Sequence, residues 1–502
     1  MNPTSTAAAQ LLKRTTSRCP ICHAACPAKV WRVEGRPAKV LLNRTCPEHG
    51  ETSVCIASDA RFYWLAKGNP ENASACSGAG RASVFANPHG SSADSPHQNT
   101  CCSAEGSAAG TLGRNVAGRG AAPFEKLSTC LALIEIVHSC NLACPTCYAD
   151  SPLGSGRGVD AVPLSDLQRR IQGVVDRKGG IEILQISGGE PTLHPQFLEL
   201  VEWIQKNPGI DYLLLNTNGV RIAHDDEFLA GLAQAVGRGN FQLYLQFDGV
   251  QLEGQRSLRG TDLRPTRERA IKRCREINLP ITLAMTVTTE NLPFIWRAIE
   301  FGLRFPHVRG ISFQPMFHSG RVPAKAGPAS GLPEVSGPTK GDEPGQARRL
   351  SCPGRLNTAD IILAAVGQSQ GKLRFEDFTP LPCGDPNCAT IGYLLKAGGR
   401  TYSISDFVDF TKVQDFLRDK VRYRLEDLMK CGCESKPLGE LLKKFEMDGS
   451  NTFRLFIKPF MDAWTWDQDR IDRCCTHVIR PDGKLDSFCR YYSGFADARL
   501  AP

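Results

Sequence analysis

The stretch "EIVHSCNLACPTCYADSP", residues 135–152, follows an apolar run and carries Cys140, Cys144 and Cys147 within eight residues. Three thiolates this close together can bind metal, but a structural zinc site needs four ligands that complete its coordination. The segment offers no obvious fourth ligand, because His138 lies on the incoming strand and is better interpreted as a packed or hydrogen-bonded histidine. A cubane [4Fe-4S] cluster held by three cysteines keeps one iron open, so the spacing favours such a cluster.

The three cysteines follow the first of six short apolar runs, which recur about every 30 residues with helical patterns between them. Runs of this kind are typical of parallel strands covered on both faces. They predict an α/β fold whose core is a partial (β/α)6 TIM-like barrel, with chemistry at the carboxyl ends of the strands. The helix expected at 163–178 is capped by Ser165. The predicted strands are 131–137, 181–187, 211–217, 241–247, 280–288 and 308–314.

Each predicted strand ends in a polar or glycine-rich cluster. After the cysteines come "SGGEP" (187–191), "NTNG" (216–219), "QFDG" (246–249), "TVTTEN" (286–291) and "QPMF" (314–317). Because the carboxyl ends of parallel strands meet at one edge, we expect all six clusters at one mouth of the barrel.

Composition limits the class of protein. The chain has 502 residues with 41% hydrophobic and 22% charged residues, as expected of a globular protein with more than one domain. It shows no secretory signal and no run of 18 apolar residues, so we expect a cytoplasmic protein. Its 21 cysteines are then better interpreted as metal ligands than as disulfides.

The formal net charge of +8 is spread along the chain without a Lys/Arg run. This pattern argues against nucleic acid as the main partner. It is compatible with an anionic small molecule, or with peripheral contact to phospholipid headgroups but no transmembrane segment.

Composition also divides the chain into segments. The C-terminal segment is expected to be a cysteine-rich α+β domain, and the two linkers are rich in small residues or in Gly and Pro. The predicted segments are a β-rich zinc-ribbon-like metal module (15–68), a low-complexity linker (69–128), the barrel core (129–320), a second linker (321–350) and the C-terminal domain (351–502).

The N-terminal module sets Cys19, Cys22 and Cys46 around turns, with His49 three residues after Cys46. Two such pairs about 25 residues apart are typical of a tetrahedral mononuclear zinc or iron site. Cys26 competes with His49 for the fourth position.

Cysteines are again dense near the C-terminus, where they suggest an auxiliary iron-sulfur cluster. Cys431 and Cys433 could join it, whereas Cys55, Cys274 and Cys352 have no partner spacing and are interpreted as structural. The candidate auxiliary ligands are Cys383, Cys388, Cys474, Cys475 and Cys489.

The C-x3-C-x2-C motif after strand one, followed by Gly-Gly-Glu-Pro after strand two, resembles the radical S-adenosylmethionine (SAM) superfamily. The resemblance implies that the three cysteines hold a [4Fe-4S] cluster whose open iron binds SAM. One-electron reduction then yields a 5′-deoxyadenosyl radical that abstracts a hydrogen atom, and the electron donor would be a flavodoxin or ferredoxin.

The same resemblance implies roles for other residues. Gly188, Gly189 and Glu190 would bind the methionine amino group, with the glycines letting the backbone approach the ligand. The family usually has an aromatic residue where this chain has Thr146, so Tyr148 is the candidate for the adenine contact. Candidates for ribose or carboxylate contacts are Asn216, Asn218, Gln246 and Asp248.

The flanking segments, among them "CPEHGE", "QPMFHSGR" and "DFTPLPCGDPNC", resemble the radical SAM subfamily of tetraether lipid synthase and the dihydropterin methylases. That subfamily has a rubredoxin-like N-terminal site, auxiliary clusters and a compact C-x3-C-G-x-C segment before the core. This chain departs from it there, because Cys76, Cys101, Cys102 and Cys130 are scattered.

Several functions follow as alternatives. C–C coupling or methylation at an unactivated C–H carbon is favoured, with a lipid chain slightly ahead of a pterin ring as substrate. A peptide-modifying radical SAM enzyme is a third possibility. A non-catalytic protein that uses metals only as folding staples is a fourth, which an open iron beside Gly-Gly-Glu-Pro argues against.

Overall fold

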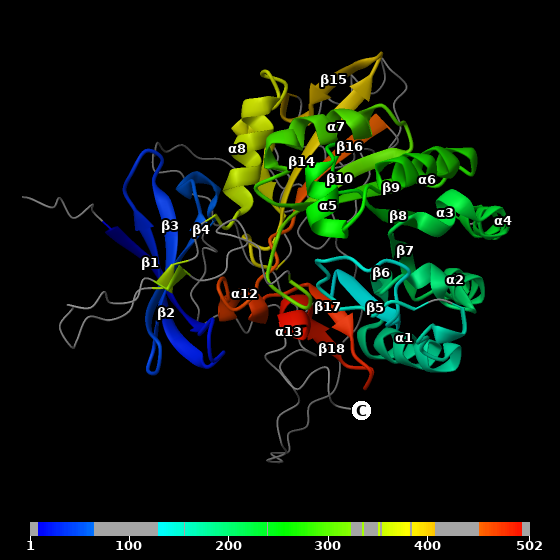
Figure 1. The fold of residues 1–502 in the computed structure, drawn as a ribbon, viewed down its shortest axis with the longest axis horizontal. Coiled ribbons are helices and arrows are strands. Elements are labelled where there is room, and N and C mark those ends of the chain that lie inside the picture. Colours follow the sequence, from blue (N-terminus) through cyan, green and yellow to red (C-terminus); the bar gives the residue numbers. More distant parts are fainter. Residues whose placement is uncertain are drawn as a thin grey trace, which may run out of the picture.

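The computed structural model describes residues 9–64, 129–322 except 155 and 238, 334–335, 350–351, 354–381, 384–406 and 451–493. A small sheet and a large sheet organise this part of the chain (Figure 1). The predicted linker 69–128 and most of 321–350 lie outside the described residues.

The small sheet is antiparallel along its first four strands, β1 (Ala9–Arg18), β2 (Ala25–Val33), β3 (Lys39–Cys46) and β4 (Gly50–Ala57). Strands β12 (Leu350–Ser351) and β11 (Glu334–Val335) extend it beyond β4. Because side chains alternate along a strand, Val30, Val40 and Leu42 share one face, which packs against Trp464 from the C-terminal part.

The core of the large sheet is formed by six strands that are parallel and adjacent in chain order. Their ends lie within one residue of the predicted ends. The predicted α/β class with parallel strands is therefore confirmed. These strands are β5 (Leu131–Val137), β6 (Ile181–Gly188), β7 (Ile210–Thr217), β8 (Phe241–Gln246), β9 (Ile281–Val287) and β10 (Val308–Pro315).

Amphipathic helices cover the outer face of these strands and bury their apolar stripes against it. The predicted cap at Ser165 is wrong: the first helix begins at Leu164, so Ser165 lies inside its first turn, and Pro163 at the cap position makes no side-chain bond. These helices are α1 (Leu164–Lys178), α2 (Phe197–Lys206), α3 (Val220–His224), α4 (Asp226–Val236), α6 (Arg264–Glu276) and α7 (Ile295–Leu303). The short α5 (Glu253–Arg259) instead contributes Arg259 to the lining of the inner cavity.

Strands from the C-terminal part extend the large sheet at both edges. Strand β16 (Thr452–Ile457) pairs in parallel with β10, and β17 (Thr476–Ile479) pairs in parallel with β5. Outside β16 lie β14 (Thr390–Ala397), β13 (Thr379–Pro380) and β15 (Arg400–Ser403); outside β17 lies β18 (Leu485–Ser487). Residues that were expected to form separate core and C-terminal domains thus pair in one sheet. No observation tests the predicted domain bounds, which stay predictions.

The two edges of this parallel sheet approach each other at one point, where Lys458 Nζ, just after β16, donates to Thr476 Oγ1 in β17 at 3.1 Å. The inner face of the sheet lines a cavity of about 240 Å³. Closure into a barrel stays a prediction.

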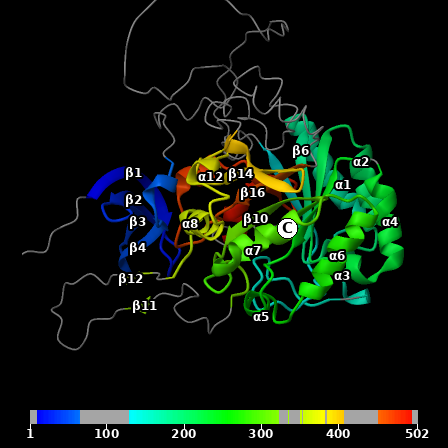
Figure 2. The same cartoon turned by 90° about the horizontal axis from the view of Figure 1, so that it is seen from above.

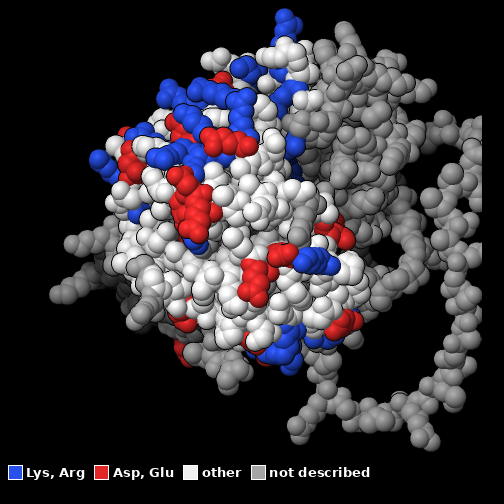
Figure 3. Space-filling view, turned by 90° about the vertical axis from the view of Figure 1, so that its right-hand side faces the viewer, with Lys and Arg blue, Asp and Glu red and all other residues white. Residues whose placement is uncertain are grey.

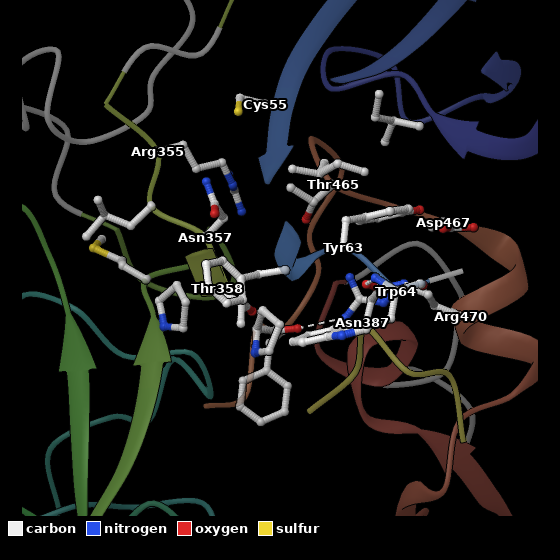
Figure 4. Close-up of a pocket in the computed structure, with 18 residues that line it drawn as sticks. Cys55, Tyr63, Trp64, Arg355, Asn357, Thr358, Asn387, Thr465, Asp467 and Arg470 are labelled. Atoms are coloured by element: carbon white, nitrogen blue, oxygen red, sulfur yellow. Dashed lines mark hydrogen bonds between the residues drawn. The ribbon is translucent and has the colours of Figure 1, made fainter. Parts of the chain in front are cut away.

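The small sheet docks on the C-terminal part, with α8 (Thr358–Gln368) and α12 (Gln468–Asp472) between it and helices α1 to α4 in both views (Figures 1 and 2). At this junction the buried Arg44 donates to the carbonyl oxygens of Ala463 and Trp464. A second cavity of about 50 Å³ lies beside it (Figure 4), where Asn387 exchanges two hydrogen bonds with the backbone of Trp64.

The outer surface over the helices carries both signs of charge, with Lys and Arg gathered toward its upper edge (Figure 3). Helix α6 contributes the exposed Arg269, Lys272 and Arg275. Within the described ranges, no helix combines the length and apolarity needed to cross a bilayer.

Candidate functional site

The three cysteines of the opening motif lie in the loop after β5 and line the large cavity. The loop is held in place by Arg321, whose backbone exchanges hydrogen bonds with Cys147 at 3.0 and 2.8 Å. Its guanidinium also donates to the carbonyl oxygens of Cys144 and Ser151, at 2.9 and 2.6 Å. The chain therefore fixes this loop through its own backbone contacts.

Burial raises the pKa of the Cys140 thiol to about 12 and also raises that of Cys144. A buried thiolate needs a nearby positive charge, which bound iron supplies.

Gly188 and Gly189 bring the end of β6 against this loop. A Cβ at Gly188 (φ +130°) would lie 2.1 Å from the Val137 carbonyl oxygen, and one at Gly189 would lie 2.0 Å from that of Ser139. The N–H groups of Gly189 and Glu190 donate to these same two oxygens at 2.9 and 3.0 Å. The space left by the missing side chains, expected to admit the ligand, is thus taken by the chain's own backbone.

Glu190 is 1% exposed, and its carboxylate joins β6 to β7. One oxygen accepts from the hydroxyls of Thr192 and Thr217 at 2.7 Å, and the other accepts from the Asn218 N–H at 2.8 Å. Burial raises the pKa of Glu190, and these hydrogen bonds act in the opposite direction.

The two asparagines of "NTNG" face different neighbours. Asn216 donates to the Ser187 hydroxyl at 3.1 Å, inside the cavity. Asn218 donates to Asn141 Oδ1 at 2.7 Å and lies 3.9 Å from the Cys140 sulfur. Asn218 therefore touches the cysteine loop directly, whereas Asn216 belongs to the strand wall.

Asp248 lines the cavity and is fully buried in an ion pair, and its expected ligand contact stays a prediction. Arg259 donates to both of its oxygens, at 2.7 and 3.0 Å, and Arg267 lies 3.4 Å away. Burial would raise the pKa of Asp248, but the two arginines outweigh it and lower the pKa. Gln246 accepts from Arg267 at 3.1 Å.

Tyr148 sits in an aromatic cluster with the C-terminal helix α13 (Phe488–Ser493). Its ring centroid lies 4.8 Å from that of Tyr492 and 5.8 Å from that of Phe488, while its hydroxyl lies 3.3 Å from the Ser187 hydroxyl. Tyr148 also lines the cavity, so its predicted adenine contact stays a prediction.

Several cavity residues were missed by reasoning from motifs. They alternate along the strands, so the period of two was the available signal. Arg259 had no such signal, because it lies on α5 and reaches the site only through the fold. The predicted strand-end clusters already include Ser187, Thr286 and Gln314, and the missed residues are Gln185, Tyr244, Arg259, Ser312, Arg454 and Lys458.

The N-terminal cysteines and His49 converge between the β1–β2 and β3–β4 turns. The contacts are 3.7 Å for Cys22–Cys46, 3.7 Å for Cys19–His49 and 3.6 Å for Cys46–His49. Four ligands at about 2.3 Å around one zinc ion would stand about 3.7 Å apart, so the geometry matches a tetrahedral metal site. Cys26 is buried beside them and donates to the Ala24 carbonyl oxygen at 3.4 Å.

The described C-terminal cysteines are near one another. Burial raises the pKa of Cys474, and the charges of Cys388 and Cys475 raise it further. Burial raises the pKa of Cys489 to about 11. Cys475 also lines the main cavity, together with Cys130. Cys383, Cys431 and Cys433 lie outside the described residues, so the auxiliary ligand set stays a prediction.

Two regions of the chain, the N-terminal sheet and the parallel core, match known protein families. Residues 134–301 match the radical SAM superfamily, and residues 11–58 match the HMPTM N-terminal zinc ribbon domain. Proteins of this superfamily use a [4Fe-4S] cluster and SAM, as the three-cysteine loop requires.

Similarity to one relative extends along nearly the whole chain. The 7,8-dihydro-6-hydroxymethylpterin dimethyltransferase of Methanocaldococcus jannaschii is 25% identical over 95% of this chain and 93% of its own length. GTP 3′,8-cyclase of Haemophilus ducreyi is 36% identical, over 20% of this chain and 29% of its own.

Solved structures match in part. Streptococcus suis SuiB bound to S-adenosylmethionine has 17% identity and a TM-score of 0.31, over 40% of this chain and 43% of its own. The methyltransferase TsrM of Kitasatospora setae has 15% identity and a TM-score of 0.28, over 38% and 34%.

Proposed function

We propose that this radical SAM enzyme, with its zinc-ribbon N-terminus, methylates a carbon of a dihydropterin ring. The observation that carries the proposal is the similarity to the pterin dimethyltransferase, which spans 95% of this chain and 93% of that enzyme. When bound, a reduced [4Fe-4S] cluster and SAM would supply the radical that removes a hydrogen atom from the ring carbon, and a further SAM would supply the methyl group.

The cavity lining is mostly apolar, with a few hydrogen-bonding groups among the apolar ones, a combination that suits a flat ring with polar edges. Side-chain amides and hydroxyls project into it from neighbouring strands, and Gln314 donates to the Tyr244 hydroxyl at 2.6 Å. A pterin ring carries several hydrogen-bond donors and acceptors, which such groups can orient. A lipid chain, slightly favoured from the sequence, would offer no hydrogen bonds to these polar groups. The similarity to the pterin dimethyltransferase does not support a lipid substrate either. The polar groups include Gln185, Asn216, Gln246, Thr282, Ser312 and Gln314.

The chain's own residues take the following parts in the proposal. Cys140, Cys144 and Cys147 hold the cluster, and the SAM amino group meets the β6 end. The Glu190 carbonyl oxygen already accepts from the Leu193 N–H at 3.0 Å, so the Gly189 carbonyl oxygen is the proposed acceptor for an ammonium. Asp248 acts through Arg259, which it holds beside the cysteine loop.

The proposed reaction also needs a one-electron donor. A flavodoxin or ferredoxin would supply it, and reduced clusters and thiols suit the cytoplasm. Both assignments belong to the proposal.

Anaerobic reconstitution, reduction and incubation with SAM and 6-hydroxymethyl-7,8-dihydropterin test the function. The wild type should release 5′-deoxyadenosine and form a methylated pterin, measured by mass spectrometry. Cys144→Ala should abolish both products, whereas Cys55→Ala, a thiol outside the large cavity, should retain them.

Absence of 5′-deoxyadenosine from wild-type enzyme with intact, reducible clusters would contradict the enzymatic assignment of the loop. Release of 5′-deoxyadenosine without any methylated pterin would instead contradict the substrate.

A further inference from the structure

A row of tyrosines leads from the wall of the large cavity into the C-terminal part of the chain. Tyr148 lines the cavity one residue after Cys147. Its ring centroid lies 4.8 Å from that of Tyr492, and the ring centroid of Tyr492 lies 4.9 Å from that of Tyr491. Tyr491 and Tyr492 are buried on α13. The three rings therefore form an unbroken contact that begins at the cavity.

The hydroxyls of this row have partners of two kinds. The Tyr148 hydroxyl lies 3.3 Å from the Ser187 hydroxyl and accepts from Asn216 Nδ2 at 3.5 Å, so its partners are neutral. The Tyr492 hydroxyl instead donates to a carboxylate oxygen of Glu135 at 2.7 Å. A carboxylate at this distance can accept a phenolic proton, and a tyrosine that can pass on its proton is easier to oxidise.

Glu135 lies on β5 and ties α13 to this strand, because its second oxygen accepts from the Tyr491 hydroxyl at 3.0 Å. The Ser319 hydroxyl bonds to the backbone carbonyl oxygens of both Tyr148 and Tyr492. These contacts hold the rings of Tyr148 and Tyr492 at a fixed distance, as electron transfer between them requires.

Apolar packing alone does not account for this arrangement. Phenylalanine at these positions would bury the same rings without the cost of placing hydroxyls and a carboxylate away from water. Helix α13 carries one such residue, Phe488, whose ring centroid lies 4.6 Å from that of Tyr492. The polar groups of the row point instead to the transfer of protons and electrons.

A radical SAM enzyme has use for such a transfer when its cavity holds no substrate. A 5′-deoxyadenosyl radical would then attack bonds of the chain itself, and the cysteine loop lines the same cavity. The O–H bond of a phenol is weaker than the C–H bond that 5′-deoxyadenosine gains, so transfer of a hydrogen atom from a tyrosine to this radical is favourable. Tyr148 offers that O–H bond beside the cysteine loop.

We propose that Tyr148, Tyr492 and Glu135 quench a 5′-deoxyadenosyl radical that meets no substrate. Tyr148 gives the hydrogen atom of its hydroxyl, so 5′-deoxyadenosine forms and an unpaired electron remains on the Tyr148 ring. Tyr492 then passes one electron to Tyr148 and its phenolic proton to Glu135, while Tyr148 takes a proton from water. The one-electron donor of the cluster finally reduces Tyr492, and Glu135 returns the proton.

This path consumes one electron and one proton for each radical quenched, and both come from outside the cavity. The inference depends on the radical SAM chemistry of the chain and not on the identity of the substrate. Failure of the dihydropterin as a substrate would therefore leave it standing.

Substrate-free turnover in deuterium oxide tests the first step. Because phenolic hydrogens exchange with solvent, the 5′-deoxyadenosine released by the reconstituted, reduced wild type should carry deuterium at its 5′ carbon, measured by mass spectrometry. Tyr148→Phe should lose this label. Tyr393→Phe, which changes a buried tyrosine on β14 away from the cavity lining, should keep it.

Freeze-quench EPR of the same substrate-free reaction tests the second step. The wild type should show a tyrosyl radical, and Tyr148→Phe should lose it. Tyr492→Phe and Glu135→Gln should both confine the radical to Tyr148, so the two variants should share one spectrum whose hyperfine splitting differs from that of the wild type. A Glu135 that only holds α13 in place would give the wild-type spectrum in Glu135→Gln, because glutamine retains an acceptor oxygen.

Unlabelled 5′-deoxyadenosine from the wild type overturns the proposal. So does a label that persists in Tyr148→Phe, because another exchangeable hydrogen of the cavity, such as that of Tyr244 or Cys130, would then be the source. A wild type that forms 5′-deoxyadenosine only with substrate overturns it as well, since no unspent radical would need quenching.

Should Tyr148→Phe release no 5′-deoxyadenosine, the spectra of Tyr492→Phe and Glu135→Gln decide, and wild-type spectra in both overturn the path. Iron content and thermal unfolding of each variant show that its clusters and its fold are intact.

Discussion

Arg259 lines the large cavity and also contacts the cysteine loop. It is 9% exposed, and it donates through Nη1 to the Thr146 carbonyl oxygen at 3.5 Å as well as to Asp248. Burial would lower its pKa, but Asp248 and Cys144 outweigh that and raise it, so the guanidinium stays charged. It therefore places a permanent positive charge next to Cys144, which is proposed as a cluster ligand. Thr146, where the family usually has an aromatic residue, contributes its backbone to this contact.

Arg259→Gln should make the cluster harder to reduce. Positive charge and hydrogen bonds near cluster sulfurs raise the reduction potential, so their loss should lower it by on the order of tens of millivolts. An EPR-monitored redox titration of the reconstituted enzyme measures this shift.

Arg256→Gln is the matched control, because Arg256 lies on the same helix but is exposed. An unchanged potential in Arg259→Gln with its cluster fully loaded would show that the guanidinium only positions the loop.

At the scale of elements, the six core strands could be predicted because each carries its signal locally. Runs such as "LALIEIV" in β5 and "IEILQIS" in β6 are apolar on both faces, and turn residues follow them. The metal ligands could also be predicted, since Cys19, Cys22, Cys46 and His49 stand at turns with ribbon spacing.

The edge strands could not be predicted in the same way. Strand β17 pairs with β5, more than 300 residues earlier in the chain, and β16 is only six residues long. Such pairing depends on distant partners and leaves little local pattern. The contacts of Gly188 with Val137 and of Asp248 with Arg259 could not be predicted either, because these partners approach only in the folded chain.

One of the side chains that dock the small sheet on the C-terminal part is the buried Arg44. Arg44 is 2% exposed and donates to the Arg18 carbonyl oxygen at 2.8 Å, to the Ser17 hydroxyl at 3.2 Å and to two carbonyl oxygens of the C-terminal part. Burial lowers its pKa to about 10, so it remains charged at neutral pH.

Arg44→Met should lower the free energy of unfolding by about 3 kcal/mol, because several buried acceptors lose their donor at once. Chemical unfolding of the metal-loaded protein measures the change. Arg14→Met, an exposed position on β1, should stay within about 0.5 kcal/mol of the wild type. Equal losses in the two variants would mean that the contact does not stabilise the junction.

At the scale of the whole molecule, the number of metal ions per chain distinguishes the N-terminal single-ion site from the iron-sulfur clusters. One zinc or iron ion is expected in the N-terminal sheet, with about four iron per cubane cluster. Cys22→Ser should remove the single ion and destabilise β1 to β4, because small metal modules fold with their metal. Elemental analysis and visible absorption should show the cluster iron unchanged.

His23→Ser is the control for that variant, since His23 lies beside Cys22 outside the ligand group. Loss of cluster iron along with the single ion would show that the two metal regions are not independent. A total iron content near four per chain would contradict the predicted auxiliary cluster.

The large sheet takes its outer parallel strands from residues 452–457 and 476–479, far along the chain from β5 to β10. A ribosome delivers β5 to β10 first, so a nascent chain holds the cysteine loop while both sheet edges are unpaired and the cavity has no β16 face. Unpaired edges recruit other strands, so incomplete chains are prone to aggregate and need protection until synthesis ends. A chain that ends before residue 452 would therefore contain every cysteine of the loop but lack the cavity walls that β16 and β17 provide. Those walls would keep a radical from attacking the wrong molecule.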